Sequence, residues 1–411
     1  MIKVAIMGYG TIGSGVYEIL ERNREIVSRA AGQEIQVAYI LDLREFPGSA
    51  VENKIVHDFD VIRDDDEVKI VVETMGGLEP AYSFVKACLE SGKHVATSNK
   101  ALVAAHGTEL LAIAREKQVN FLFEASVGGG IPIIRPLYRC LMGEKIEEIT
   151  GILNGTTNFI LTKMDKEGTS FQWALKEAQA LGYAERNPEA DVEGHDTCRK
   201  LAILIAMVTG KEVNYEEIST EGITEITDVD FKYAAALDTS IKLVGSSHME
   251  AGKVHAWVAP VMIDRDHPLY AVSDVYNGIL VKGTMLGTTM YYGSGAGKLP
   301  TASAVVADIL EAAKEMDSNI PLGWTEEKQE ISPIGESVHR YFVRVSGTYE
   351  DRKDMVETVF GKSRVVELPE MEEFAFLTGP MKESRFLENL EILKVELTAE
   401  YQKVIQVIRA E

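Results

Sequence analysis

The sequence has few cysteines, little positive charge and no long hydrophobic run. Its 411 residues include three cysteines. Cys88, Cys140 and Cys198 lack metal-ligand spacing, which is typical of reduced thiols in a cytoplasmic protein. Lysine and arginine total 42 against 64 acidic residues, a formal net charge of −22. That charge argues against nucleic acid and anionic membrane surfaces as partners.

The apolar residues that are present occur in short runs. The longest run is too short to span a bilayer, and the first expected strand begins at residue 2, which leaves no room for a secretory signal peptide. We therefore expect a cytoplasmic protein without a membrane segment. A chain of 411 residues is long enough for two or three domains, each with a core of its own.

A glycine-rich turn follows the first apolar strand, residues 2–7, and opens a segment with apolar residues at helical spacing. Strand, glycine turn and helix form the context that a dinucleotide-binding turn requires. Gly8 permits the tight turn, Gly10 lets the backbone approach a pyrophosphate, and Gly13 lets the helix pack close to the strand. The phosphates would lie at the helix N-terminus.

An acidic residue follows the second expected strand, residues 35–41. Asp42 stands where a carboxylate accepts hydrogen bonds from an adenosine ribose. It would repel a 2′-phosphate, which favours NAD over NADP, but Arg44 is close enough in sequence to offset that repulsion. The expected cofactor is NAD or NADP, with a preference for NAD.

Strands and helices continue to alternate as far as residue 123. Strands are expected at residues 69–74, 94–97 and 119–123, with helices at 80–89 and 101–115. The alternation predicts an α/β protein with a Rossmann-type, doubly wound parallel sheet. Ligands bind beyond the carboxyl ends of such strands, where Thr74 and Lys100 stand.

The most distinctive run is acidic and lies at residues 178–200. Asp196 and Lys200 are four residues apart on an expected helix, so they share one face. Such a pair is usually a solvated surface contact. Here Lys200 opens an apolar segment, residues 201–208, that is typical of a buried helix. Burial lowers the pKa of a lysine, which suits a group that exchanges protons near neutral pH.

Three further junctions combine glycine with polar residues, at residues 124–132, 149–158 and 293–303. The second is expected to be a strand and a polar turn, with a helix beginning at residue 159. The third precedes an expected helix at residues 304–314. Junctions of this kind line active-site clefts.

These segments resemble those of one enzyme family. Residues 178–200 match A-x3-G-Y-A-x2-N-P-x2-D-V-x-G-x-D-x3-K, the signature of homoserine dehydrogenases. The turns at 8–15, 97–100, 151–158 and 293–301 are similar to the family's other blocks, in the same order. The resemblance implies reversible NAD(P)-linked interconversion of L-homoserine and L-aspartate 4-semialdehyde, in the branch leading to threonine and methionine.

The resemblance also implies roles for particular residues. Lys200 would exchange a proton with the substrate hydroxyl, Asp196 would bind substrate and hold the lysine, and Lys100 would be a second active-site lysine. Glu185 would receive the substrate ammonium. The other substrate-binding residues implied are Asn154, Thr156, Gly182 and Asp191. The cofactor-binding residues implied are Gly8, Gly10, Thr11, Ile12, Gly13, Asp42, Thr74, Lys100 and Gly297.

The family also places a monovalent cation, usually sodium, after the last strand of the nucleotide domain. Its ligands here would be Glu124 and the backbone carbonyls of Val127, Gly129 and Ile131, since oxygen ligands suit a hard cation. The alternative is a glycine turn in which Glu124 caps backbone N–H groups.

The order expected after residue 335 is strand, helix, strand, strand, helix, strand, which resembles the ACT-type regulatory domain of longer family members. The turn at residues 346–351 lacks the Asp-x-Pro-Gly pattern of an effector site, which makes threonine feedback doubtful. We therefore expect three domains: a Rossmann domain at 1–130, completed by a helix near 301–320, an α+β substrate and dimerisation domain at 131–300, and an ACT-like domain at 335–411. The assembly implied is a homodimer or homotetramer.

Two other functions stay open. A non-catalytic sensor of amino acid and nucleotide on the same fold would have no need for Asp196 and Lys200 together. Another Rossmann semialdehyde dehydrogenase, acting through a thiohemiacetal, would need an activated cysteine. Cys140 and Cys198 have no evident basic partner at a fixed offset.

Overall fold

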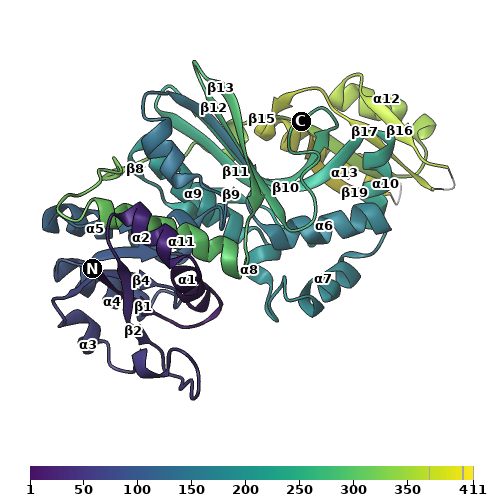
Figure 1. Ribbon diagram of the computed structural model, residues 1–411. Helices are drawn as coiled ribbons and strands as arrows, with labels where there is room; N and C mark the ends of the chain where they lie inside the picture. Colours follow the sequence, from purple (N-terminus) through teal and green to yellow (C-terminus); the bar gives the residue numbers. More distant parts are fainter. Residues whose placement is uncertain (370, 400–401, 411) are drawn as a thin grey trace. The chain divides into compact units, whose positions relative to one another are not determined.

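The computed structural model describes residues 1–369, 371–399 and 402–410 (Figure 1). The chain divides into two compact units. The first comprises residues 1–146, 199–215 and 283–329, and the second comprises residues 147–198, 216–282 and the C-terminal part from 330. Within the described ranges, no helix is long and apolar enough to cross a membrane.

The first unit is built on a parallel sheet whose strand order is β3-β2-β1-β4-β5-β6. This is the doubly wound order of a dinucleotide-binding domain, so the predicted fold class is confirmed. Its strands are β1 (Ile2–Met7), β2 (Ile35–Leu41), β3 (Ile55–Val56), β4 (Val68–Glu73), β5 (His94–Thr97) and β6 (Phe121–Leu122). The sequences of these strands are nearly continuous apolar runs, because both faces of the sheet are buried.

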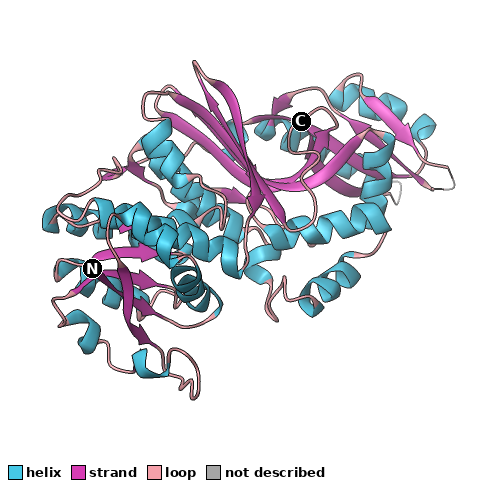
Figure 2. Cartoon of the chain, viewed as in Figure 1, coloured by secondary structure: helices cyan, strands magenta, loops and turns pink. Residues whose placement is uncertain are grey.

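Helices alternate with these strands (Figure 2). The helices are α1 (Thr11–Arg22), α2 (Arg24–Ala31), α3 (Asp60–Arg63), α4 (Ala81–Glu90), α5 (Lys100–Lys117) and α11 (Lys298–Lys314). Although α11 is distant in sequence, it packs directly on α1: a side chain at Gly15 would come within 2.9 Å of the Ala302 Cβ. The remaining elements of this unit are η1 (Glu52–Lys54), η2 (Glu124–Ser126), η3 (Pro136–Cys140), β8 (Lys211–Glu212), β13 (Gly287–Ser294) and β14 (Thr325–Lys328).

The second unit contains a mixed sheet. Its strands are β7 (Ile146–Ile152), β9 (Ser219–Thr220), β10 (Thr239–Glu250), β11 (Lys253–Asp264) and β12 (Tyr276–Gly283). The long hairpin of β10 and β11 is paired in register from Thr239 opposite Asp264 to Glu250 opposite Lys253. The helical segments are α6 (Gly155–Glu167), α7 (Phe171–Ala180), α8 (Glu189–Val192), η4 (Tyr215–Glu217) and α10 (Asp228–Ala236), with α9 (His195–Thr209) beginning in this unit.

One sequence expectation about this unit is wrong. The helix expected from residue 159 begins at Gly155, so residues 155–158 form its first turn instead of a polar loop. The physical reason is the cap: the Asn154 side chain accepts a hydrogen bond from the Thr157 N–H at 2.9 Å, which satisfies an otherwise unpaired donor.

The C-terminal segment has the predicted strand and helix order, with one additional two-residue strand before its last helix. It comprises η5 (Ile334–Glu336), β15 (Val338–Ser346), α12 (Tyr349–Phe360), β16 (Arg364–Glu367), β17 (Glu373–Leu377), β18 (Met381–Lys382), α13 (Glu383–Ala399) and β19 (Val404–Ala410). The expected helix at 383–390 is longer than predicted, because apolar Leu393 and Leu397 continue its buried face. The strand order is β19-β15-β17-β16, and β19 pairs with β11, so these strands continue the sheet that contains the β10–β11 hairpin.

Candidate active site

The glycine turn after β1 is closely packed at Gly8 and Gly13 but open at Gly10. Gly8 has a φ of 94°, in the left-handed region. A Cβ at Gly13 would lie 1.9 Å from the Gly8 carbonyl oxygen, whereas one at Gly10 would meet nothing within 4 Å. The Thr74 hydroxyl donates to the Gly8 carbonyl at 2.9 Å. The structure therefore brings Gly8, Gly13 and Thr74 together, and Gly10, Thr11 and Ile12 lie at the start of α1.

Asp42 lies directly after β2 and is held by the neighbouring turn. Its carboxylate accepts the Tyr9 N–H at 2.8 Å and two guanidinium bonds from Arg44, at 2.8 and 2.9 Å. These bonds hold the pKa of Asp42 well below its usual range, and the hydrogen bond from the Arg44 side chain contributes most. The Arg44 side chain is 61% exposed, so a cation stands at the place expected for the ribose.

The ends of β4 and β5 are tied together by Glu73, a residue that no sequence motif singled out. This fully buried carboxylate accepts the Thr97 hydroxyl at 2.5 Å and the Met75 N–H at 2.8 Å. The signal that could have found it is an acidic residue ending an apolar strand. Lys100 follows as the first residue of α5, whose N-terminus is capped by Asn99.

The turn after β6 is organised by Glu124, whose pKa is raised by burial. Its carboxylate accepts the N–H groups of Ile133, Ile134 and Arg135, at 2.7, 2.8 and 2.8 Å. A carboxylate offers about four lone-pair positions, and the Arg135 guanidinium approaches the same group, 3.5 Å from Glu124 Oε2. The predicted capping role of Glu124 is confirmed.

Two further residues that the sequence analysis missed support this turn: Asp308 on α11 and Arg135 just before η3. The Asp308 carboxylate accepts the Glu124 N–H at 2.9 Å and pairs with the Arg135 guanidinium. Burial raises the pKa of Asp308 well above its usual value, against the opposing effect of Arg135. The pairing explains why an aspartate stands on the buried face of α11. The helix itself begins after Gly297, which adopts a φ of 117°.

Two carboxylates of the acidic run meet at one amide. Asn154 donates to Asp191 at 2.7 Å and to Asp196 at 2.8 Å. The Thr156 hydroxyl donates to the Tyr183 carbonyl at 2.6 Å, which ties the first turn of α6 to the turn of Gly182. Glu185 follows on that turn with an exposed side chain.

The pair singled out from the sequence lies on α9. Asp196 is 2% exposed and Lys200 is 8% exposed. The prediction that Lys200 opens a buried helix is therefore confirmed, and the solvated-pair alternative is wrong. A carboxylate and an ammonium on one buried helix turn can bind a polar substrate and exchange a proton with it.

The thiohemiacetal alternative requires an activated cysteine, and Cys88 does not meet that requirement. All three are free thiols. Burial raises the pKa of Cys88 to about 12, which disfavours its thiolate.

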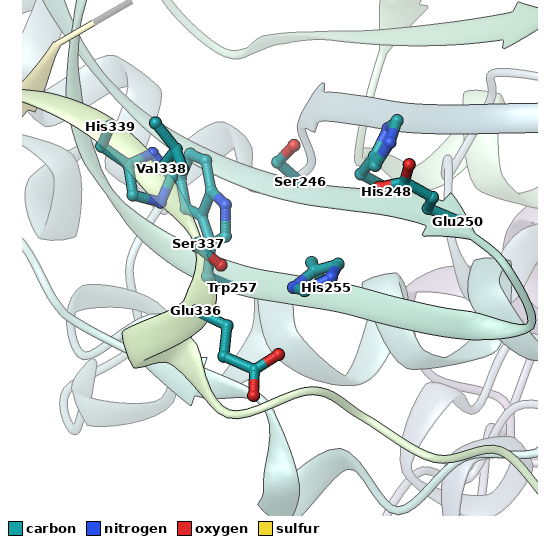
Figure 3. Close-up of a pocket in the computed structure, with 9 residues that line it drawn as sticks. All are labelled: Ser246, His248, Glu250, His255, Trp257, Glu336, Ser337, Val338 and His339. Atoms are coloured by element: carbon teal, nitrogen blue, oxygen red, sulfur yellow. The ribbon is translucent and has the colours of Figure 1, made fainter. Parts of the chain in front are cut away.

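A separate pocket of about 310 Å³ lies between the hairpin of β10 and β11 and the start of β15 (Figure 3). The side chains of His255, Trp257 and His339 line it, and none of the predicted site residues does. Burial, reinforced by the charge of Arg409, lowers the pKa of His339 to about 4, so that imidazole is neutral at physiological pH.

Comparison with known proteins assigns the family. The model of the homoserine dehydrogenase NAD-binding domain matches residues 8–124, and the homoserine dehydrogenase model matches residues 132–310. Homoserine dehydrogenase of Bacillus subtilis is 37% identical over 96% of each chain. The chain belongs to the homoserine dehydrogenase family. It is accordingly an NAD(P)-dependent oxidoreductase that acts on a CH–OH group.

Solved homoserine dehydrogenases agree with this assignment. The crystal structure of the Thiobacillus denitrificans enzyme has a TM-score of 0.88 and 35% identity, and the match covers 100% of this chain and 98% of that one. A hyperthermophilic archaeal homoserine dehydrogenase in complex with NADPH has a TM-score of 0.65 and 30% identity. That match covers 76% of this chain and 97% of the other.

Proposed function

We propose that Lys200 is the acid and base of homoserine oxidation and aspartate 4-semialdehyde reduction. The observation that carries the proposal is its buried position on α9, one helical turn after the buried Asp196. Bound NAD(P) supplies the hydride acceptor and donor. Lys200 takes the hydroxyl proton of homoserine during oxidation and returns it to the aldehyde oxygen during reduction, which balances the hydride at the same carbon.

The substrate is positioned by the carboxylates of the second unit. Glu185 receives the substrate ammonium, with Gly182 on the same turn, and Asp196 binds substrate next to Lys200. Asp191 supports this network, and Thr156 contributes from the first turn of α6. Lys100 is the first residue of α5. In this proposal it is the second active-site lysine, near both substrate and nicotinamide. These roles rest on the family motif together with the burial and contacts described above.

We infer a preference for NAD. Asp42 is ionised and lies directly after β2, where its charge repels a 2′-phosphate. Ribose hydroxyls would bind it by replacing Arg44 donors, because Arg44 and the Tyr9 N–H together fill its four lone-pair positions. Arg44 is the competing group, and the relative in complex with NADPH shows that the family also binds the phosphorylated cofactor. A specificity constant for NADP tenfold above that for NAD would contradict the preference.

A monovalent cation such as sodium would be held by Glu124 and by the carbonyls of Val127, Gly129 and Ile131. It would stabilise the turn that precedes the second unit's first strand. The C-terminal βαββαβ segment acts as an ACT-like domain for assembly, in a cytoplasmic homodimer or homotetramer. The turn at residues 346–351 lacks the pattern of an effector site, which favours assembly over effector binding.

The test is reduced-nicotinamide absorbance with L-homoserine and NAD or NADP, in the presence of sodium. We expect turnover by the wild type and a loss of at least about a thousandfold in kcat for Lys200→Ala. Circular dichroism confirms the fold of the variant. Absence of wild-type turnover, or an active Lys200→Ala enzyme, would favour the sensor or a different dehydrogenase. Inactivation by a thiol reagent that substrate prevents would favour the thiohemiacetal route.

A further inference from the structure

Asn154 occupies the junction between β7 and α6 with its side chain 5% exposed. Its backbone is extended, with φ −127° and ψ 118°, as the residue before a helix usually is. The Oδ1 atom accepts the Thr157 N–H at 2.9 Å and the Thr157 hydroxyl at 3.2 Å. One half of the amide is therefore used to start α6.

The other half of the amide binds two carboxylates. Nδ2 donates to an oxygen of Asp191 at 2.7 Å and to an oxygen of Asp196 at 2.8 Å. An amide has two N–H hydrogens, so each carboxylate receives one. The two carboxylate oxygens can be no more than about 5.5 Å apart, the sum of the two bonds.

Two carboxylates at this distance repel each other, and repulsion favours protonation of one of them. Donated hydrogen bonds oppose this, because they stabilise the ionised form. A hydroxyl at the same position could serve one carboxylate only, and an ammonium could not also accept the bonds that start α6. The amide is thus suited to holding both carboxylates while it caps the helix.

We propose that Asn154 is a positioning residue that keeps Asp196 ionised and oriented for the reaction, with its side chain bound to Asp191 and Asp196 instead of to the substrate. The inference rests on the proposed function, in which Asp196 lies one helical turn before Lys200. It gives the Asn-Gly-Thr-Thr-Asn segment a specific role, because Asn154 joins the start of α6 to the start of α9.

The test uses substitutions that keep the cap. Asn154→Ser retains a good N-cap but loses the paired donors, and Asn154→Asp retains a cap but adds a third carboxylate. We expect kcat/KM for homoserine to fall roughly 10- to 100-fold in Asn154→Ser and further in Asn154→Asp. The acidic limb of the pH profile moves to higher pH in both, while the KM for NAD stays within about twofold.

A matched control separates the proposed positioning role of Asn154 from its contribution to the stability of the fold. Ser170 caps α7 through the Trp173 N–H and makes no contact with either carboxylate. Ser170→Ala should lower the melting temperature as a lost cap does, and leave the kinetics and the pH profile unchanged.

If Asn154→Ser does not fold, the variant Asp191→Asn provides an independent test of the proposal. Removing one of the two charges should move the acidic limb to lower pH, opposite to the effect at Asn154. An unchanged profile in folded Asn154→Ser, or in Asp191→Asn, overturns the proposal. Wild-type turnover distinguishes this failure from failure of the proposed function, since an inactive wild type would refute the function itself.

Discussion

At the scale of single residues, cofactor choice depends on the pair of Asp42 and Arg44. Arg44 neutralises the carboxylate and presents an exposed cation, and its guanidinium also donates to the Tyr9 carbonyl at 3.1 Å. In Arg44→Ala the carboxylate would act alone against a 2′-phosphate. We expect the ratio of kcat/KM for NAD to that for NADP to rise roughly tenfold, equivalent to about 1.4 kcal/mol.

Steady-state kinetics with both cofactors measures this ratio. Arg22→Ala is the control, because Arg22 is an exposed arginine at the end of α1 that pairs with Glu18. A ratio that falls, or that changes equally in both variants, would mean that Arg44 does not discriminate between the cofactors.

At the scale of elements, the turn between β1 and α1 contains two glycines with different roles. Gly13→Ala places a Cβ against the Gly8 carbonyl, so the turn must shift. We expect a loss of about 1–3 kcal/mol in the free energy of unfolding. Gly10→Ala has free space, so its stability should be unchanged while its KM for NAD rises roughly tenfold, because the pyrophosphate approaches the backbone there.

Denaturant unfolding of the apoenzyme and cofactor titration followed by nicotinamide fluorescence measure the two effects. The contrast between the variants is the decisive result. Equal stability of Gly13→Ala and wild type would contradict the close contact, and unchanged cofactor affinity in Gly10→Ala would contradict the pyrophosphate position.

At the scale of the whole molecule, stability should depend on pH through Lys242 of β10. Burial lowers the pKa of this lysine to about 8, and its ammonium donates to the Val272 carbonyl at 2.7 Å. Between about pH 8 and 10.4 the unfolded chain keeps a proton that the folded protein loses, so this residue's contribution to stability rises with pH. At pH 7 the folded protein carries the full cost of the buried charge.

Lys242→Met should therefore raise the free energy of unfolding at pH 7, on the order of 1–3 kcal/mol, and remove the rise above pH 8. Guanidinium denaturation at pH 7 and pH 10 tests both statements. The exposed Lys232, replaced by Met, is the control. A variant that is less stable at pH 7 would show that the bond to Val272 outweighs the desolvation of the ammonium.

The sequence by itself determined what depends on neighbouring residues. The alternation of strands and helices, the glycine turn after β1 and the order of the C-terminal elements are local periodicities and turn signals, and all were predictable. The burial of Lys200 was predictable for the same reason, because the eight residues that follow it are largely apolar. The start of α6 was missed, since Asn154 can end a strand or begin a helix with equal local preference.

Tertiary structure decided what depends on residues distant in the chain. Asn154 meets partners 37 and 42 residues away, and Arg135 meets Asp308 across 173 residues. The packing of α11 on α1 and the pairing of β19 with β11 are of the same kind. Such contacts leave no periodic trace, because a single buried polar residue satisfies its hydrogen bonds with whichever groups packing brings beside it.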